Sequence, residues 1–401
     1  MDLVDLELFI SKTRLIFGHS FDGDILLCGG KPLRTVGLRA AKRKKGAVRH
    51  KGTTGLPKHA IKLVSDAIDS SSSELRRLNL EIWNNSEVRF KEEKACKLLA
   101  ERVSSQARFL VAACERTVCY NAEYDALPEL GHASGHNLIT TSTLALAVGV
   151  SAAMKALNIP GTLTDCSVVL MTHGMPDFST ARAVTKASWK FRAKFYGKTA
   201  HTTPTPQQIQ KTESIQSVIL DAGKAPNIIP DYAEGSFSLC AIDSPELERL
   251  RIRVIPIYEG AAAAPGCTVE LFWDALYEDV VTNMSLANRY TQYMINDLGL
   301  TPADIPSPSD SSPKVNKNGS SYVTTYRNGI QAPFSINATD MHHTPCFQQA
   351  GLGTDYAHME SFRAGKTNAL VGLDVLLDDA FYRQVQQEWV SDMKQRGRLV
   401  E

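Results

Sequence analysis

The sequence predicts an α/β protein in which a smaller α+β domain, built on an antiparallel sheet, is inserted into an α/β domain. Residues 168–171 are continuously apolar, as expected for a strand that is covered on both faces. Apolar and polar residues alternate in the stretches 189–195, 236–241 and 268–273, which is typical of strands with one solvent-exposed face. With 401 residues, of which 43% are hydrophobic, the chain is long enough for two domains.

The predicted α/β domain covers residues 71–185 and 279–401, and the inserted sheet domain covers residues 186–278. Residues 1–70 have weak periodicity and several glycines, which predicts an N-terminal extension with little structure of its own. A basic run at 39–51 is compatible with nuclear targeting or nucleic-acid binding, but a solvated loop is the simpler interpretation. The formal net charge of +1 argues against a polyanion-binding surface over the whole molecule.

Each element follows from the spacing of its apolar residues. The first helix follows a run of serines, in which Ser72 or Ser73 can act as its N-cap, and it ends near Asn84. A later helix carries Pro256 and is expected to kink there. The other elements are expected as helices at 90–103, 137–156, 246–260, 284–297, 355–375 and 379–395, strands at 107–114, 117–124 and 321–336, and a polar loop at 302–320.

The cysteines and the N-terminus indicate an intracellular protein. The eight cysteines are scattered and include no C-x-x-C pair, which is typical of reduced proteins. The chain begins with acidic residues, unlike a signal peptide, and no apolar run looks long enough to cross a bilayer. We therefore expect a cytoplasmic protein with no membrane and no nucleic-acid partner.

Histidines and carboxylates gather around the strand expected at 117–124. His132 and His136 stand four residues apart, which at the start of a helix places both imidazoles on one face. Glu123 and Asp125 lie at the end of the preceding strand, and this edge of a sheet is where an α/β metallohydrolase builds its site. The same spacing also occurs by chance, so hydrogen-bonded structural histidines remain an alternative.

The segments around these residues resemble the metal-dependent amidohydrolases of peptidase family M20, in its aminoacylase-like subgroup. The resemblance covers about residues 75–395, and its motifs follow one another in the family's order. The matching segments are AEYDALP at 122–128, GHASGHN at 131–137, MTH at 171–173, FYGKTAH at 195–201, APNIIPD at 225–231, HHTPCF at 342–347 and GTDYAH at 353–358.

This resemblance implies a zinc-peptidase-like catalytic domain with an inserted α+β dimerisation, or lid, domain. It also implies hydrolysis of amide bonds in N-acyl amino acids or small dipeptides, with a divalent metal such as zinc, manganese or cobalt. The resemblance further implies a homodimer that forms through the inserted domain.

Carried over by position, His136, His173 and His343 match the family's metal ligands. Asp125 matches the aspartate beneath the metal site. His201 matches the histidine that stabilises the oxyanion. Each residue also has a structural explanation, as a hydrogen-bonded histidine or, for Asp125, as an anchor of the following turn.

The chain departs from the family pattern at two places in the predicted site. Ser134 replaces a metal-ligating cysteine, and a hydroxyl is a poorer ligand than a thiolate. The family's segment with two adjacent glutamates, one of them the general base, is absent, and Asp165 is the only acidic residue between Gly161 and His173. Little or no turnover is therefore predicted.

The same deletion affects the predicted fold. Residues 163–168 are too few for a crossover between parallel strands, so the sheet has one strand fewer or is poorly packed there. A helix of the inserted domain is also missing after His201. Three hypotheses remain: a metallo-amidohydrolase, a catalytically inactive relative that binds ligands or dimerises with a paralogue, and a truncated gene product. The roles of Ser134, His132 and Glu123 are left open.

Overall fold

The computed structural model describes most of the chain, and all structural statements below concern this part. The described residues are 4–5, 8–11, 14–17, 55–88, 91–106, 108–109, 118–157, 168–196, 213–223, 230–274, 276–308, 314–316 and 328–398. The chain divides into two compact units. Unit 1 comprises Met1–Ala183, Thr282–Lys314 and Tyr326–Glu401, and unit 2 comprises Val184–Val281 and Val315–Thr325.

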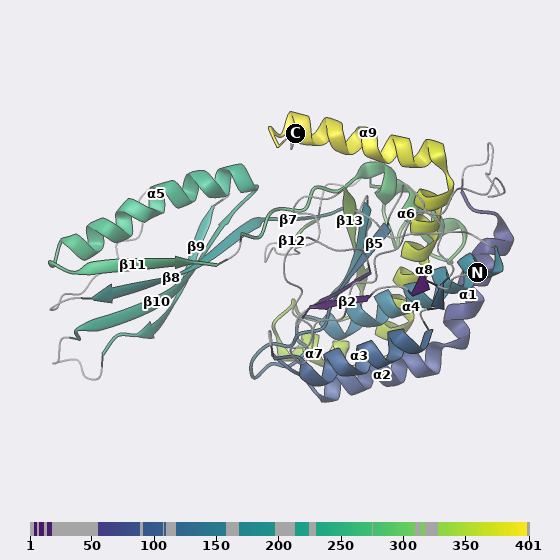
Figure 1. Ribbon diagram of the computed structural model, residues 1–401, viewed down its shortest axis with the longest axis horizontal. Coiled ribbons are helices and arrows are strands. Elements are labelled where there is room, and N and C mark those ends of the chain that lie inside the picture. Colours follow the sequence, from purple (N-terminus) through teal and green to yellow (C-terminus); the bar gives the residue numbers. More distant parts are fainter. Residues whose placement is uncertain are drawn as a thin grey trace. The chain divides into compact units, whose positions relative to one another are not determined.

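Unit 1 is built on a mixed five-stranded sheet, which Figure 1 shows among its helices. The strand order is β13 (Gly329–Ser335), β6 (Val168–Met175), β5 (Val118–Glu123), β3 (Arg14–Phe17) and β2 (Leu8–Ser11). The β13–β6 and β6–β5 pairs are parallel, and the other two pairs are antiparallel. Every residue of β6 and β13 is buried, as the continuous apolar run predicts for β6. Two short strands, β1 (Val4–Asp5) and β4 (Arg108–Phe109), pair separately.

The connection between β5 and β6 is the helix α4 (His136–Ala156). Because β5 and β6 are direct parallel neighbours, α4 is the crossover that such a pair requires. The sheet therefore passes from β5 to β6 without a strand between them.

Helices surround this sheet. The helix α4 contacts β5 and β6, and it also packs against α1 (Lys58–Ser70), α2 (Ser72–Asn84) and α8 (Asp355–Leu377). The helix α3 (Glu93–Gln106) contacts β2, and α6 (Met284–Asn296) contacts β13, α8 and α9 (Asp379–Gln395). Gly365 of α8 lies so close to α4 that an added Cβ would be 2.5 Å from the carbonyl oxygen of Ser142. These two helices are therefore in close backbone contact.

The helix α1 contradicts the expectation that residues 1–70 have little structure of their own. Its residues Ala60, Ile61, Val64 and Ile68 are buried, and the last three belong to the main core of unit 1. Their spacing is that of an amphipathic helix. The helix directly follows the stretch 38–57, which is rich in basic residues and glycine and obscures the start of the apolar period. The run at 39–51 lies outside the described residues.

Within the described residues, α4 alone is long and apolar enough to cross a membrane. This corrects the expectation that no apolar run has the necessary length. However, 72% of its apolar window is buried inside the structure, as expected for a core helix of a globular unit.

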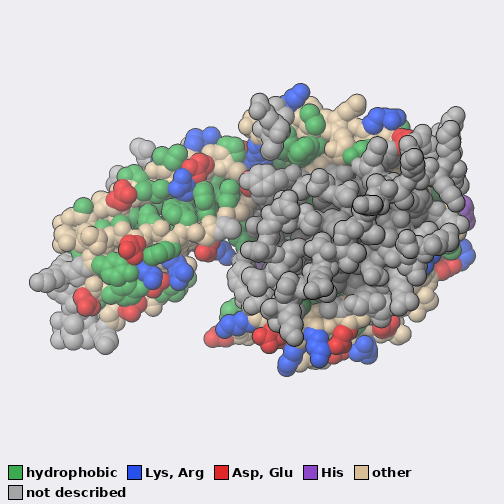
Figure 2. Space-filling view, in the orientation of Figure 1, with side chains coloured by type: hydrophobic (Ala, Val, Ile, Leu, Met, Phe, Trp, Pro, Cys, Tyr) green, Lys and Arg blue, Asp and Glu red, His purple; other side chains and the backbone are tan. Residues whose placement is uncertain are grey.

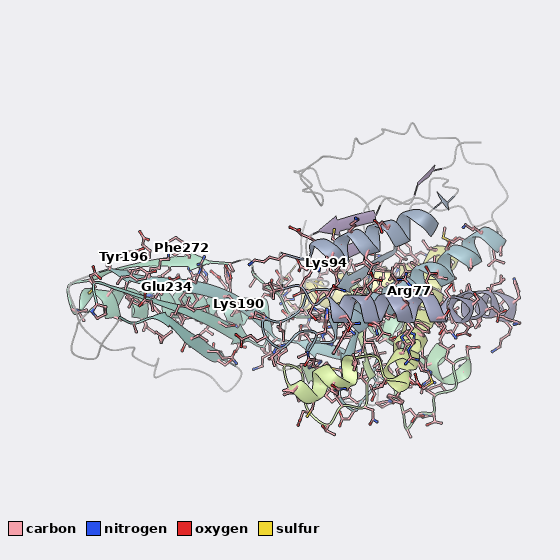
Figure 3. The ribbon with its side chains drawn as sticks, turned by 90° about the horizontal axis from the view of Figure 1, so that it is seen from below. Arg77, Lys94, Lys190, Tyr196, Glu234 and Phe272 are labelled. Atoms are coloured by element: carbon pink, nitrogen blue, oxygen red, sulfur yellow. The ribbon has the colours of Figure 1, made fainter. Side chains whose placement is uncertain are left out.

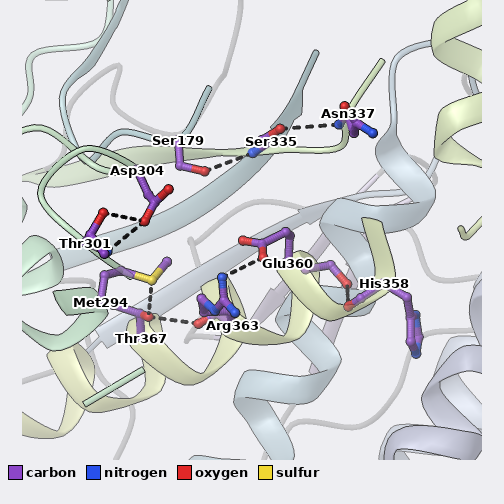
Figure 4. A network of polar contacts seen from close by, with 11 residues as sticks. Ser179, Met294, Thr301, Asp304, Ser335, Asn337, His358, Glu360, Arg363 and Thr367 are labelled. Atoms are coloured by element: carbon purple, nitrogen blue, oxygen red, sulfur yellow. Dashed lines mark hydrogen bonds and ion pairs between the residues drawn. The ribbon is translucent and has the colours of Figure 1, made fainter. Parts of the chain in front are cut away.

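Polar side chains on α8 form a network of hydrogen bonds and an ion pair inside unit 1 (Figure 4). Arg363 donates to Oε1 of Glu360 at 2.6 Å, and Thr367 donates to the carbonyl oxygen of Arg363 at 2.8 Å. Burial raises the pKa of Glu360, and the nearby Arg363 opposes this effect. The hydrogen bond from Arg363 therefore offsets the free-energy cost of burying the Glu360 carboxylate.

Unit 2 contains a four-stranded antiparallel sheet that is covered on one face by the helix α5 (Ser244–Ala263). The strand order is β11 (Thr268–Trp273), β8 (Ala187–Tyr196), β10 (Tyr232–Ala241) and β9 (Ser214–Asp221). Phe191, Phe237 and Tyr258 pack between the sheet and α5, with ring centroids 4.9 to 5.3 Å apart. The helix α5 includes Pro256 and continues to Ala263. A short strand, β7 (Ala183–Thr185), pairs with β12 (Lys314–Asn316).

The opposite face of this sheet carries polar and charged side chains together with the exposed rings of Tyr196 and Phe272. Figure 3 labels Lys190 and Tyr196 from β8, Glu234 from β10 and Phe272 from β11, which all occupy even-numbered positions. Their neighbours at odd-numbered positions in these strands point to the α5 side, so the alternation read from the sequence matches the two faces.

The cysteines differ from the expectation. Cys96 in α3 is disulfide-bonded, whereas Cys240, Cys267 and Cys346 are free. Scattered spacing along the chain did not reveal this bond, because spacing does not determine which thiols meet in space. The cytoplasmic location stays a prediction.

Candidate functional site

The predicted site residues meet where β5 and β6 end. Glu123 is the last residue of β5, and Asp125 follows it. His136 is the first residue of α4, and His173 lies near the end of β6. Since β5 and β6 are parallel, their carboxyl ends open on the same edge of the sheet, which is where open α/β sheets bind ligands.

His136 lies between two carboxylates. Its Nδ1 donates to Oδ1 of Asp125 at 2.8 Å. This hydrogen bond assigns the proton to Nδ1 and leaves the lone pair on Nε2. Nε2 lies 3.6 Å from Oε2 of Glu123, which is too far for a hydrogen bond. All three side chains are at most 16% exposed. A histidine held by a carboxylate in this way is the usual arrangement of a metal-ligating imidazole.

The carbonyl oxygen of Gly174 accepts hydrogen bonds from two further histidines. It accepts from Nδ1 of His173 and from Nε2 of His342, both at 2.8 Å. The two rings contact each other edge to face, with centroids 4.8 Å apart. His173 also lies edge to face with His136, at a centroid distance of 6.1 Å. These contacts bring His136, His173 and His342 into one cluster.

Burial favours the neutral form of two of these imidazoles, His173 and His342. It lowers the pKa of His173 well below its usual value, and the neighbouring His342 and His136 add to this effect. Burial also lowers the pKa of His342, against the hydrogen bond to Gly174. A neutral imidazole has one nitrogen with a free lone pair, which metal binding requires.

His342 contacts the ring of His173, and the predicted His343 lies close enough to both rings to help lower their pKa values. His343 is exposed and has a left-handed backbone conformation with φ of 67°. Its backbone N–H donates to the carbonyl oxygen of Ala133 at 2.9 Å, which ties this loop to the turn before α4. The assignment of His343 as a metal ligand therefore stays a prediction.

His132 does not share a helix face with His136, because α4 begins at His136 itself. The His132 ring is buried, and its Nε2 hydrogen-bonds to the carbonyl oxygen of Ile82 at 3.2 Å. Burial, together with a smaller effect of the nearby His136, lowers its pKa to about 4. His132 therefore anchors the turn to α2.

The remaining predicted residues are placed only in part. Ser134 is half-buried in the turn before α4. His201 and Asp165 lie outside the described residues. Among the described residues, no group of three or more His, Cys, Asp or Glu side chains is arranged so that it could hold a metal ion as it stands.

Comparisons with known proteins agree with the motifs. No family model matches the chain. The Xaa-Arg dipeptidase of Mus musculus is 26% identical over 412 residues, which cover 84% of this chain and 93% of that protein. The Xaa-Arg dipeptidase of Homo sapiens is 26% identical over 81% of this chain and 91% of its own length. One of the subunits of the p-aminobenzoyl-glutamate hydrolase of Escherichia coli (strain K12) is 22% identical over 58% of this chain and 64% of that protein.

Solved structures share the fold. A Bacillus subtilis protein described as a dinuclear metal binding peptidase from the M20 family aligns with a TM-score of 0.51 and 14% identity, over 76% of this chain and 99% of that chain. An aminobenzoyl-glutamate utilization protein from Klebsiella pneumoniae aligns with a TM-score of 0.51 and 11% identity, over 79% of this chain and 99% of that chain. The expected fold class, an α/β catalytic domain with an inserted domain, is confirmed. The motifs, these relatives and the shared fold together support an M20 metallo-amidohydrolase assignment.

Proposed function

We propose that this chain is a divalent-metal-dependent amidohydrolase that acts on N-acyl amino acids or small dipeptides. The observation that carries the proposal is the position of His136 between Asp125 and Glu123. The relatives support the substrate class, because they are named as dipeptidases and as a hydrolase of p-aminobenzoyl-glutamate, which is an N-acyl amino acid.

The histidine and carboxylate side chains present are of the kinds that bind divalent cations in proteins. Two ligands that each lie about 2 Å from one ion are separated by roughly 3 to 4 Å. The 3.6 Å between Nε2 of His136 and Oε2 of Glu123 falls in this range. His342 offers a buried Nδ1 that has no hydrogen-bond partner among the described residues. A third donor must still move toward the first two, because the described side chains do not already converge.

Each residue then has a definite task. Asp125 holds the proton of His136 on Nδ1 and so directs Nε2 toward Glu123. The carbonyl of Gly174 holds the proton of His173 on Nδ1 in the same way. A bound divalent cation would supply Lewis acidity, which polarises an amide carbonyl and acidifies water. Zinc is the first choice for imidazole and carboxylate donors, with manganese or cobalt as alternatives.

The rate is expected to be low. The sequence lacks the adjacent glutamates that include the family's general base, and general-base catalysis contributes about 10²- to 10⁴-fold. We therefore expect turnover slower by about this factor than in an enzyme that retains the pair. An inactive, ligand-binding relative is the alternative.

The test is a hydrolysis screen of the purified chain against N-acyl amino acids and dipeptides with Zn²⁺, Mn²⁺ or Co²⁺. We expect slow hydrolysis that a chelator stops and that is absent in a His136→Ala variant. A rate that persists in this variant would show that the site has been assigned wrongly. Bound substrate without any hydrolysis in calorimetry would favour the inactive alternative.

We further propose a homodimer that forms through unit 2. The strand β9 is an edge of the sheet, with β10 as its one neighbour. Val218, Ile219 and Leu220 on β9 are 62%, 57% and 53% exposed. Figure 2 shows hydrophobic side chains gathered on the visible face of this unit. An exposed apolar edge strand readily pairs with a second copy of itself.

Sedimentation of the purified chain tests this part of the proposal. We expect a dimer for the wild type and a monomer for an Ile219→Lys variant. Ile252→Lys is the matched control, because Ile252 is 58% exposed on α5 and does not lie on the edge strand. A monomeric wild type, or equal effects of the two variants, would contradict a dimer through β9.

A further inference from the structure

We propose that the groove between α2 and α3 is a binding site for a medium-chain fatty carboxylate. The groove is separate from the edge where β5 and β6 end, and no residue of the predicted catalytic site lines it. The inference therefore goes beyond the proposed function and does not depend on it.

The groove is large enough for a small organic molecule. Its volume is about 330 Å³, and its walls are residues of α2 and α3 together with Asn85, which follows α2. Sites for small organic ligands have volumes of about 300 to 1,000 Å³. Figure 3 labels Arg77 from α2 and Lys94 from α3, the two helices that form the groove.

The floor of the groove is apolar. Ile82 of α2 is 2% exposed and Ala95 of α3 is 4% exposed, and Leu98 is half-buried one turn further along α3. An alkyl chain that covers these side chains removes apolar surface from water, which is favourable. The floor therefore favours a ligand with an apolar body.

Most of the charged side chains on the rim already have partners. Glu81 accepts from Nη1 of Arg77 at 2.8 Å. Nζ of Lys97 lies 4.0 Å from Oε1 of Glu101. Because each pair consists of one cation and one anion, a ligand meets little net charge along these parts of the groove.

Lys94 is the cation of the rim that has no carboxylate partner among the described residues. Its Nζ lies 3.5 Å from the amide oxygen of Asn85, which is long for a hydrogen bond. The nearby Glu87 accepts from the backbone N–H groups of Lys94 and Ala95 at 3.0 and 2.9 Å, so its carboxylate is already occupied. The carboxylate of a ligand would supply Lys94 with a counter-charge.

The positions of Lys94 and Glu101 give the ligand a direction. At 1.5 Å per residue they lie about 10 Å apart along the axis of α3. A carboxylate bound at Lys94 places its alkyl chain over Ala95 and Leu98. The reversed orientation would bring the carboxylate near Glu101, which repels it. The groove therefore favours an anionic head group with one apolar chain.

A groove filled by solvent alone is the competing explanation. Such a groove would have the same volume and the same apolar floor. The experiment must therefore test the charge of the head group as well as binding itself.

The test is equilibrium dialysis of the full chain with radiolabelled octanoate, in about 0.1 M salt, where charges more than about 10 Å apart are largely screened. We expect saturable binding of one octanoate per chain and no binding of octylamine, which carries the opposite charge. Hexanoate should bind about 3- to 10-fold more weakly, because it buries two methylene groups fewer.

A charge reversal separates Lys94 from its surroundings. We expect Lys94→Glu to weaken octanoate binding at least 10-fold. Lys91→Glu is the matched control, because Lys91 is an exposed lysine close to the start of α3 that does not line the groove, and it should change the affinity less than 3-fold. Equal effects of the two variants, equal binding of octanoate and octylamine, or no binding of octanoate would each overturn the inference.

A His136→Ala variant distinguishes this groove from the predicted catalytic site. We expect it to bind octanoate with unchanged affinity, because His136 does not line the groove. Loss of octanoate binding in this variant would place the ligand at the catalytic edge and overturn the inference. The proposed amide hydrolysis is measured separately and would be unaffected by that result.

Discussion

Oδ1 of Asp125 lies 2.8 Å from Nδ1 of His136, and this contact determines which nitrogen of the imidazole faces the site. The two residues come from different elements, because Asp125 follows β5 and His136 opens α4. The hydrogen bond therefore connects the end of a strand to the start of its crossover helix. The tautomer of His136 thus depends on how β5 and α4 are assembled.

Removing the charge of Asp125 should weaken metal binding without unfolding the protein. In an Asp125→Asn variant the amide can donate to Nδ1, which moves the imidazole proton to Nε2 and blocks the lone pair. We expect metal affinity to fall about 10- to 100-fold, as for other residues that orient a ligating histidine. Equilibrium dialysis with Zn²⁺ measures the affinity. The exposed Asp340→Asn serves as the control, and an equal loss in both variants would exclude a specific role for Asp125.

The close contact between α4 and α8 should not tolerate a methyl group. An added Cβ at Gly365 would lie 2.5 Å from the carbonyl oxygen of Ser142, so Gly365→Ala should destabilise the fold by about 1 to 3 kcal/mol. Gly260 is the matched control, because it lies inside a helix with nothing within 4 Å of its added Cβ. There, alanine should increase stability by up to about 1 kcal/mol. Urea unfolding distinguishes the two signs.

Asp374 in α8 should stabilise the folded protein, because its ion pair with Arg289 is buried. Tyr293 also donates to Oδ2 of Asp374 at 2.7 Å, and the Tyr293 oxygen accepts from the backbone N–H of Leu56 at 3.0 Å. Asp374→Asn would leave the guanidinium without a counter-charge, at a cost of about 3 to 5 kcal/mol. Urea unfolding measures the difference.

The control for this prediction is the exposed ion pair between Lys62 and Asp66 on α1. Asp66→Asn should cost at most about 0.5 kcal/mol, because pairs four residues apart on a helix surface contribute little. If Asp374→Asn cost no more than this control, the buried network would not stabilise the fold.

His358 should make the protein less stable in mild acid. Burial lowers its pKa to about 4, with a smaller lowering by Arg76 included, against the backbone of Ser72 and the carboxylate of Asp355. An unfolded histidine titrates near 6.5, so the unfolded state binds more protons between the two values. The contribution of His358 to the free energy of unfolding is therefore constant above about pH 6.5. It falls as the pH drops toward 4 and does not change below that.

Unfolding free energies of the wild type and a His358→Gln variant, measured from pH 4 to pH 7, test this prediction. The difference between the two proteins should change by on the order of 1 to 3 kcal/mol across this window. A constant difference would mean that His358 has an ordinary pKa in the folded protein.

Local patterns in the sequence predicted the elements that have strong periodicity. The apolar run at 168–171 became the buried strand β6, and the alternating stretches became the two-faced sheet of unit 2. The helix α1 was missed, since its period was masked by the polar residues before it. Its four buried side chains are recognised as core residues only once α4 is known to pack against α1.

The candidate site could be predicted only in part, for a physical reason. Motifs identify Asp125 and His136 because their spacing along the chain reflects a strand end followed by a helix start. They cannot separate His342 from His343, since burial of one or the other depends on how the loop meets His173 and Gly174. Glu123 could not be assigned either, because its distance to His136 arises only when β5 and α4 are assembled.

The placement of His136 at the first position of a buried helix has a further consequence for how the site opens. Amide hydrogens in such a helix exchange with solvent only through large-scale opening of the core, which is rare. The His136 side of the site therefore stays in place while a ligand enters and leaves.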